Sequence, residues 1–178
     1  NADFKADAIC LGDSTIFTDS SFALDSANII SWFWDFGDSI TDTIQNPTHL
    51  YDSAGTYNVT LTVVTDSGCS ANTVKAVDVH VLPQANFSPV LGCSGAGVFF
   101  ADLSSVPVGS LTGWEWDFGD GGTSLLQDPA HPYAAEGPYN VRLIVTTIEG
   151  CIDDTVRQVE VYPEPVAGFS FLPAEPDK

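Results

Sequence analysis

Apolar side chains recur at every second position over short stretches of this chain, with polar residues between them. Trp32, Trp34 and Phe36 follow this spacing. Aliphatic residues repeat it further along, at Val59, Leu61, Val63, Val77, Val79 and Val81. A period of two places alternate side chains on opposite faces of a strand. The pattern therefore predicts β-strands that each bury one face.

Turn-forming dipeptides and tripeptides, such as Gly-Asp, Asn-Pro and Ser-Ala-Gly, separate these stretches. They recur every ~8–12 residues, a spacing typical of small β-sandwiches. No stretch with a helical period of convincing length lies between them. The predicted fold class is therefore all-β, an antiparallel β-sandwich.

The whole pattern occurs twice. The string WFWDFGDSITDTIQNPTHLYDSAGTYNVTLTV, residues 32–63, returns about 80 residues later as WEWDFGDGGTSLLQDPAHPYAAEGPYNVRLIV, residues 114–145. This period exceeds the ~20–50 residues of solenoid repeats and suits whole small domains in tandem. We predict one domain at residues 1–83 and a second at 84–165. The opening of the second repeat, PQANF, reappears as PVAGF, so residues 166–178 are expected to begin a third repeat or a linker within a longer array.

Two aromatic residues in each repeat indicate an immunoglobulin-like sandwich. Trp34 and Trp116 stand where such domains carry their core tryptophan. Tyr57 and Tyr139 each follow a turn and precede a buried strand position by two residues. We therefore expect each of them to form a tyrosine corner.

The ordered motifs W-x-W-D-F-G-D, P-x-H-x-Y and G-x-Y-x-V-x-L-x-V resemble the signature of the polycystic kidney disease (PKD) domain. The resemblance occurs twice and covers nearly the whole chain. It implies immunoglobulin-like β-sandwiches of the PKD type in tandem, as found in large secreted or surface adhesin-like proteins of Bacteroidetes. The first repeat departs from the pattern with Ser39 and Ile40 where the second has Gly121 and Gly122. We expect the hairpin turn there to be less tight or differently shaped.

The charge of the chain excludes some partners. It carries 5 Lys and Arg against 24 Asp and Glu, a formal net charge of -19. Such a charge repels nucleic acid phosphates and anionic lipid head groups, so neither nucleic acid nor a membrane surface is an expected partner. No run of apolar residues reaches the ~18 needed to span a membrane. The same charge attracts cations, calcium included.

Four cysteines fall at matching places, two in each repeat: Cys10, Cys69, Cys93 and Cys151. Four cysteines permit three connectivities. The equivalence of the repeats favours pairing within each repeat, Cys10 with Cys69 and Cys93 with Cys151. Disulfides predict an extracellular or cell-surface location. The alternative of a zinc site lacks close ligand spacing.

The repeated acidic residues and histidines are candidates for a catalytic site. They are Asp35, Asp38 and His49 in the first repeat and Asp117, Asp120 and His131 in the second. Aspartates at the end of a strand commonly accept hydrogen bonds from the amides of a turn. Nucleophilic catalysis needs an activated Ser or Cys beside a His, and the cysteines are better explained as disulfides. We therefore predict structural roles for these residues and no catalytic site.

Calcium is the one cofactor that the sequence suggests. The resemblance implies it, because some PKD-like modules of secreted proteases hold calcium partly through acidic residues around this strand. Glu115 and Asp117 are the candidate ligands, since carboxylate oxygens suit this hard cation. Phe33 stands at the position of Glu115 in the first repeat, so the site is expected to be better formed in the second repeat.

Several Asp-Ser and Asp-Thr dipeptides precede a small or aliphatic residue. They resemble the O-glycosylation sequon that Bacteroidetes use for exported proteins. The candidate acceptors are Ser14, Ser26, Ser39, Thr43, Ser53 and Thr155. The same dipeptides are also common in turns, so both interpretations stay open.

These observations favour a non-catalytic extracellular repeat module that acts as an adhesion or spacer stalk of a large surface or secreted bacterial protein. Its expected partners are neighbouring repeats of the same chain or fibre and an unidentified surface glycan or protein. The alternatives are polymer-binding accessory domains of a secreted hydrolase, such as a chitinase or protease, and the repeating subunit of an extracellular filament. A row of exposed tryptophans would favour polymer binding. Trp32 and Trp114 share the strand parity of the core tryptophans and are expected to be buried.

Overall fold

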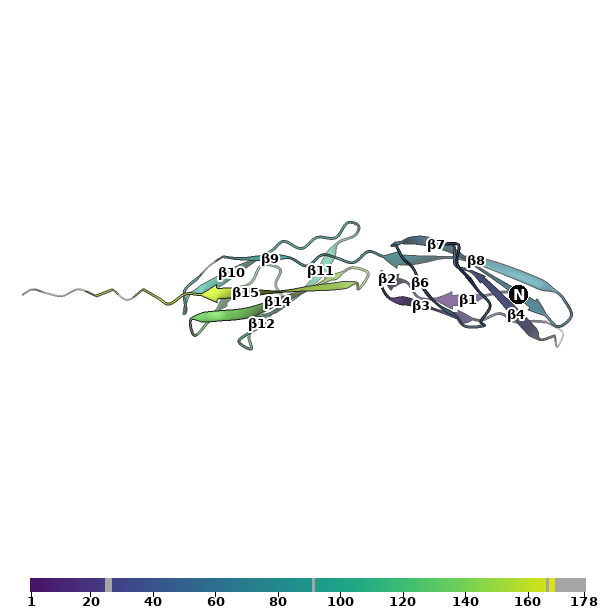
Figure 1. Ribbon diagram of the computed structural model, residues 1–178, viewed down its shortest axis with the longest axis horizontal. Helices are drawn as coiled ribbons and strands as arrows, with labels where there is room; N and C mark the ends of the chain where they lie inside the picture. Colours follow the sequence, from purple (N-terminus) through teal and green to yellow (C-terminus); the bar gives the residue numbers. More distant parts are fainter. Residues whose placement is uncertain (25–26, 91, 166, 169–178) are drawn as a thin grey trace, which may run out of the picture. The chain divides into compact units, whose positions relative to one another are not determined.

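The computed structural model describes residues 1–24, 27–90, 92–165 and 167–168. Every regular element in this part of the chain is a β-strand, which confirms the predicted all-β class (Figure 1). Over these same residues, no helix has the length and apolar character that crossing a bilayer requires. The predicted start of a third repeat, residues 166–178, lies outside the described residues apart from 167 and 168.

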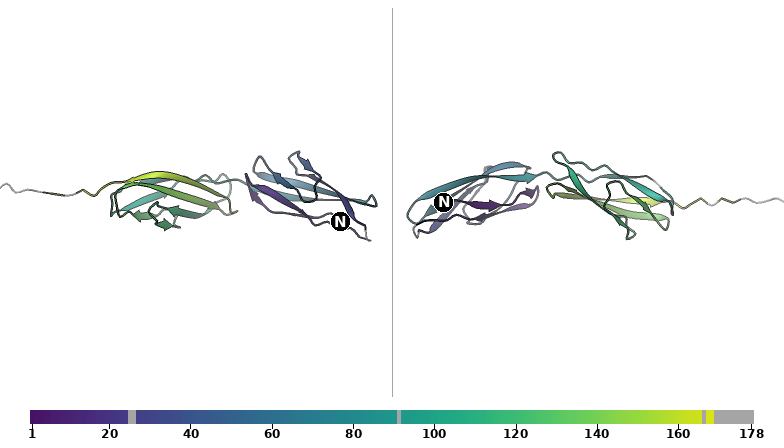
Figure 2. Two further views of the ribbon diagram at one scale, coloured as in Figure 1. Left: turned by 60° about the horizontal axis from the view of Figure 1, so that its bottom comes forward. Right: turned by 180° about the vertical axis from the view of Figure 1, so that it is seen from behind.

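The first repeat, residues 1–83, folds into two sheets, and the views of Figure 2 show its strands in two layers. Its strands are β1 (Phe4–Ala6), β2 (Ile9–Cys10), β3 (Ser14–Asp19), β4 (Ile29–Asp35), β5 (Thr41–Asp42), β6 (Thr48–Leu50), β7 (Gly55–Thr65) and β8 (Ser70–His80). One sheet has the order β1-β3-β6 and the other the order β2-β8-β7-β4-β5. Neighbouring strands run antiparallel except for β2, which lies parallel to β8 and places Cys10 beside His80.

The second repeat, residues 84–165, follows the same plan. Its strands are β9 (Phe87–Val90), β10 (Gly97–Asp102), β11 (Leu111–Asp117), β12 (Thr123–Ser124), β13 (Ala130–Pro132), β14 (Gly137–Thr147) and β15 (Ile152–Val161). The sheet orders are β13-β10-β9 and β12-β11-β14-β15. A parallel bridge between Cys93 and Tyr162 stands where the first repeat has β2.

Each repeat is built around its predicted core tryptophan. Trp34 is fully buried, and the ring centroids of Phe4 and Phe17 lie 5.1 and 5.4 Å from its own. The same distances, 5.1 and 5.4 Å, recur around the tryptophan of the second repeat, among Phe87, Phe100 and Trp116. These edge and tilted packings are the arrangements that aromatic rings prefer. The alternating pattern of the sequence therefore corresponds to the buried face of each sheet.

By their contacts, the described residues group into two compact units whose limits cross those of the repeats. The first unit takes in Asn1–Ala85 together with Ser104–Gly113 and Val145–Asp153, and the second takes in Asn86–Leu103, Trp114–Ile144 and the described residues from Asp154 onward. Within the first unit, the main chains of Gln84 and Ser105 bond reciprocally at 2.7 and 3.0 Å. The domain limits predicted from the repeat period stay a prediction.

Candidate functional site

The doubled Trp-Asp-Phe-Gly-Asp string ends a strand and starts a turn in both repeats. At the end of β4, Asp35 accepts a hydrogen bond from the Gly37 amide at 2.9 Å, and Asp38 accepts one from the Ile40 amide at 3.0 Å. The second repeat has the same bonds at 2.9 Å, from Gly119 to Asp117 and from Gly122 to Asp120. The prediction that these carboxylates shape turns is confirmed.

The histidine of each repeat completes this turn. His49 Nε2 lies 2.6 Å from Asp38 Oδ2, and its ring stacks on Phe36 with centroids 4.1 Å apart. Tyr51 closes the other side with its ring at 87° to the imidazole. In the second repeat, His131 and Asp120 make the same contact at 2.8 Å. The two histidines are thus hydrogen-bonding residues of the fold, as predicted.

The aspartate of this pair is held in its charged form. Partial burial acts to raise the pKa of the Asp38 carboxyl, but hydrogen bonds from His49 and from the Ile40 amide outweigh it and lower the pKa. Asp120 has a lowered pKa for the same reasons, with His131 and the Gly122 amide as donors. A carboxylate with a lowered pKa is a poor general base at neutral pH. Its negative charge instead holds the histidine in place.

The hairpin turn has different residues in the two repeats but the same backbone conformation in both. Ser39 has φ +77° and Gly121 has φ +93°, so both occupy the left-handed region. The Phe36 amide donates to the Ile40 carbonyl at 3.1 Å, and the corresponding bond from Phe118 measures 3.0 Å. The expectation of a differently shaped first turn is therefore wrong, because the hydrogen bonds impose one geometry on either sequence.

Both tyrosine corners are present. The Tyr57 hydroxyl donates to the Ser53 carbonyl at 2.8 Å, and the Tyr139 hydroxyl donates to the Ala135 carbonyl at 3.0 Å. Each bond ties the start of a long strand to the loop before it. The prediction is confirmed, and it strengthens the assignment to the immunoglobulin-like class.

The outer tryptophans differ from expectation. Trp32 and Trp114 are half-buried, because each indole N–H reaches a carboxylate at the rim of the core. Trp32 Nε1 donates to Asp19 Oδ2, and Trp114 Nε1 donates to Asp102 Oδ2, both at 2.7 Å. Sequence reasoning missed these aspartates. The signal was a repeated Phe-x-Asp, at Phe17–Asp19 and Phe100–Asp102.

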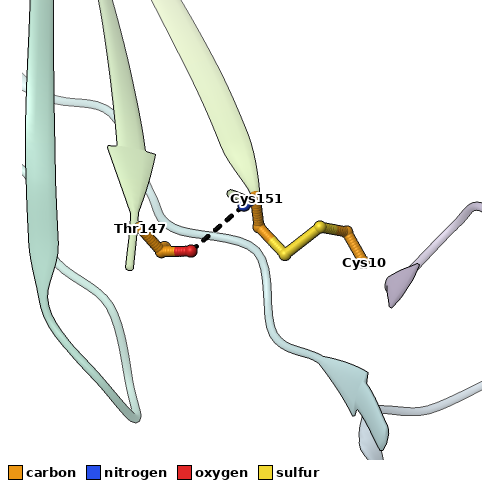
Figure 3. Close-up of a disulfide and its surroundings, with 3 residues drawn as sticks. All are labelled: Cys10, Thr147 and Cys151. Carbon is orange, nitrogen blue, oxygen red and sulfur yellow. Dashed lines mark hydrogen bonds between the residues drawn. A yellow bond between two sulfur atoms is a disulfide. The ribbon is translucent and has the colours of Figure 1, made fainter. Parts of the chain in front are cut away.

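The cysteines pair differently from the prediction. The structure joins Cys10 to Cys151 by a disulfide (Figure 3) and leaves Cys69 and Cys93 as thiols. The Cα atoms of the bonded pair lie 5.5 Å apart. The bonded residues come from different repeats in the sequence but from the same compact unit. The predicted pairing of Cys10 with Cys69 and of Cys93 with Cys151 is therefore wrong.

The length of one strand explains why. Cys69 immediately precedes β8, whereas Cys10 lies beside the last residue of that strand, His80. The 11 residues of β8, at about 3.4 Å each, separate the two ends by more than ~30 Å. A disulfide needs Cα atoms within about 7 Å. In the second repeat β15 separates Cys151 from Cys93 in the same way.

The calcium candidates lie on one exposed strip of the second repeat. Glu115 and Asp117 are exposed residues of β11 and line a shallow pocket of ≈ 370 Å³ together with Arg142. The Arg142 guanidinium donates to Asp154 at 3.0 Å, so a positive charge already occupies this surface. In the described part of the chain, no group of three or more His, Cys, Asp or Glu side chains is placed to hold a metal ion. Calcium binding stays a prediction.

The glycosylation candidates lie at different kinds of surface position. Ser26 falls outside the described residues. Four of the others are exposed: Ser14, Ser39, Thr43 and Ser53. Thr155 is half-buried within β15. Their modification stays a prediction.

The matches to known protein families divide the chain into the same two repeats. The sequence model of the PKD domain matches residues 1–81 and again residues 80–161. The chain is 31% identical over 137 residues to the pre-pro-metalloprotease PrtV of Vibrio cholerae, covering 75% of this chain and 15% of that protein. It is 41% identical over 64 residues to the collagenase ColA of Bacillus cereus, covering 36% of this chain and 7% of that protein.

A solved structure of fibronectin(III)-like modules of CbhA from Clostridium thermocellum supports the fold. It aligns with a TM-score of 0.51 at 14% identity and covers 96% of this chain and all of that one. At this identity the likeness concerns the fold alone. Because the sequence model of one family matches nearly the whole chain in two adjoining copies, this chain belongs to the PKD domain family.

Proposed function

We propose that this chain is a non-catalytic extracellular segment that serves as a spacer or adhesion stalk within a larger protein. One observation carries the proposal: the polar groups of the doubled motif are bonded within the fold, at nearly the same distances, in both repeats. The His–Asp contacts of 2.6 and 2.8 Å and the turn bonds of 2.9–3.0 Å illustrate this. A repeated spacer needs two stable copies of a fold and no reactive group.

Two features support a location outside the cell. A disulfide such as Cys10–Cys151 persists in oxidising compartments and is rare in the cytosol of most organisms. The formal net charge of -19 would keep a long array soluble and discourage association between arrays. Neighbouring repeats of the same chain or fibre are then the first expected partners.

The comparisons favour a second candidate function, an accessory module of a hydrolase. The matched relatives include a metalloprotease and a collagenase, and the aligned part makes up only 15% and 7% of their lengths. In this role the chain would help a neighbouring catalytic domain to engage a polymer such as collagen. The half-buried state of Trp32 and Trp114 gives this candidate less support, since their indole N–H groups are already bonded to aspartates.

Cosedimentation of the intact chain with collagen fibrils, chitin and cellulose separates the two candidates. For a spacer, we expect the bound fraction to stay at the level of an unrelated acidic protein of similar size. Saturable binding to one polymer would contradict the spacer role and support the accessory role. The measurement is made at physiological salt, so that the large negative charge is screened beyond about 8 Å.

Stretching the chain between its termini tests the spacer role directly. The disulfide closes a loop with a sequence separation of 141 residues. At about 3.4 Å per residue, this loop withholds roughly 480 Å of extension until it is reduced. We expect the oxidised chain to lengthen by that much less than the reduced chain in single-molecule pulling. Equal extensions would show that the cross-link carries no load.

A further inference from the structure

We propose that Cys69 and Cys93 are halves of further disulfides of the Cys10–Cys151 kind, each completed by the PKD repeat next to it along the same chain. Cys10 and Cys93 are called here the strand-end cysteines, and Cys69 and Cys151 the hairpin cysteines. In this scheme Cys93 bonds the hairpin cysteine of a following repeat, and Cys69 bonds the strand-end cysteine of a preceding one. The proposal holds whether the array acts as a spacer or as an accessory module.

The strand-end cysteines have the same backbone setting. Cys10 lies parallel to His80, and Cys93 forms a parallel bridge with Tyr162. The amide of the next residue donates to the carbonyl of that neighbour in both cases, at 2.8 Å. The cysteine carbonyl then accepts from an amide three residues on, at 3.0 Å for Cys10 and 3.1 Å for Cys93. Cys93 is therefore presented as Cys10 is, but without a partner sulfur.

The hairpin cysteines match equally well. The Cys151 amide donates to the Thr147 hydroxyl at 3.1 Å, and the Cys69 amide donates to Thr65 at 3.2 Å. The threonine amide returns a bond to the cysteine carbonyl, at 2.8 Å in the second repeat and 2.9 Å in the first. The glycine before each cysteine has a left-handed φ, +88° and +83°. One loop geometry thus presents both sulfurs.

The state of the sulfurs is what differs. Cys151 is bonded and only 1% exposed, whereas Cys69 is exposed and free. A bond between the two cysteines of one repeat is prevented by the strand of 10 or 11 residues that lies between them. A strand-end cysteine that bonds a hairpin cysteine must therefore come from another repeat. In the observed disulfide, the preceding repeat along the sequence supplies that strand-end cysteine, because Cys10 of the first repeat bonds Cys151 of the second.

Each bond forms by thiol–disulfide exchange with a small-molecule disulfide, for which glutathione disulfide is the reagent in the test. The thiolate of one cysteine attacks a sulfur of glutathione disulfide and releases one glutathione thiolate. The thiolate of the second cysteine attacks the resulting mixed disulfide and releases the other. Two protein thiols are oxidised to one disulfide, and one glutathione disulfide is reduced to two glutathione molecules, whose thiolates take up the two protons that the protein thiols lose.

The test compares the present chain with a three-repeat chain, made by adding a second copy of residues 84–165 after residue 165. Both are oxidised with glutathione disulfide at low protein concentration, free thiols are counted by maleimide labelling, and disulfides are mapped by mass spectrometry. The present chain keeps two thiols, Cys69 and Cys93. We expect the longer chain to keep two as well, because Cys93 bonds the added hairpin cysteine. Four remaining thiols, or a Cys10–Cys69 bond in either chain, would overturn the proposal.

A Cys93→Ser version of the three-repeat chain is the matched control, and it should keep one thiol more than its parent. A second measurement does not depend on folding of the added repeat. The present chain is oxidised at high concentration, and the disulfides that link two copies are mapped. Cys69–Cys93 links should exceed Cys69–Cys69 and Cys93–Cys93 links several-fold. Unselective pairing already gives about twice as many Cys69–Cys93 links as either other kind, so a ratio no higher than that would contradict the complementarity of the two cysteine types.

Discussion

The two repeats build one turn from different residues. The first uses Ser39 and Ile40 where the second uses Gly121 and Gly122, yet both close the same backbone bonds and place a histidine on an aspartate. Their aromatic cores also agree to within about 0.1 Å in centroid distance. The comparison teaches that the histidine–aspartate pair and the turn amides fix this part of the fold. The tip accepts either serine or glycine, and serine adopts its left-handed φ at a cost in backbone strain.

The cysteines give the opposite lesson. Cys69 and Cys151 have the same local structure, but one is a free thiol and the other half of a disulfide. Nothing within the hairpin accounts for this difference. The state of each cysteine depends on whether a strand-end cysteine from another repeat lies beside it. Local sequence therefore decides the backbone geometry of the hairpin, and the order of the repeats decides whether its cysteine is a thiol or half of a disulfide.

The largest expected effect is loss of the cross-link. Cys10→Ser opens a loop with a sequence separation of 141 residues, which in the chain-entropy treatment lowers the free energy of unfolding by about 5 kcal/mol. Cys69→Ser removes the equivalent of Cys151 but no bond, and it should change the free energy by less than ~0.5 kcal/mol. Urea titration followed by tryptophan fluorescence measures both. Similar losses for the two variants would contradict the observed pairing.

A β-carbon at Gly122 tests how tightly the second turn is packed. It would lie 2.4 Å from His131 Cε1 and 3.0 Å from Asp120 Oδ1. Gly122→Ala must therefore displace the imidazole from Phe118, and we expect a loss of about 2 kcal/mol, as in other overpacked sites. Ile40→Ala, the matched change in the first repeat, leaves a β-carbon in place and should cost well under ~1 kcal/mol. Equal effects would show that the second turn can adopt the packing of the first.

Acid should weaken both turns together. The folded-state pKa of Asp38 and of Asp120 is lowered, so the stability that these groups contribute is present above the ordinary aspartate pKa of 3.8 and is lost as the pH falls through the folded pKa. Asp38→Asn should lower the free energy of unfolding at pH 7 by about 1 kcal/mol and flatten its decline below pH ~4. Thermal unfolding between pH 2.5 and 7 measures this. If the stability of Asp38→Asn declines with falling pH as steeply as that of the unmodified chain, the histidine–aspartate pair does not contribute to acid destabilisation.

Local periodicity predicted much of this molecule because the relevant forces act over a few residues. Alternation located the strands, and the positions of Trp34 and Tyr57 identified the core and the corner. The disulfide could not be predicted in this way, since it depends on which end of β8 each cysteine occupies and on the next repeat. The left-handed Ser39 was also hidden, because only the bonded turn forces a serine into a conformation that glycine adopts freely.

Exchanging the tip residues measures that strain. Ser39 has φ +77°, where a side chain costs about 1 kcal/mol relative to glycine. We expect Ser39→Gly to raise the free energy of unfolding by roughly 0.5–1 kcal/mol, and Gly121→Ser to lower it by a similar amount. A β-carbon at Gly121 would meet nothing within 4 Å, so the effect is one of backbone conformation alone. Effects of the same sign in the two repeats would contradict the equivalence of the turns.

Calcium is expected to have the smallest effect, and only in the second repeat. Glu115 and Asp117 supply carboxylates, but Asp117 already bonds the Gly119 amide and Arg142 lines the same pocket. Any affinity should therefore fall in the weak range of extracellular modules, a dissociation constant of about 10⁻⁴–10⁻³ M or above. Isothermal titration calorimetry with calcium is carried out on the unmodified chain and on the Glu115→Phe variant, which reproduces Phe33 of the first repeat. Binding that survives this substitution would place the ion elsewhere, and binding strengthened by Arg142→Gln would show that the guanidinium competes for the site.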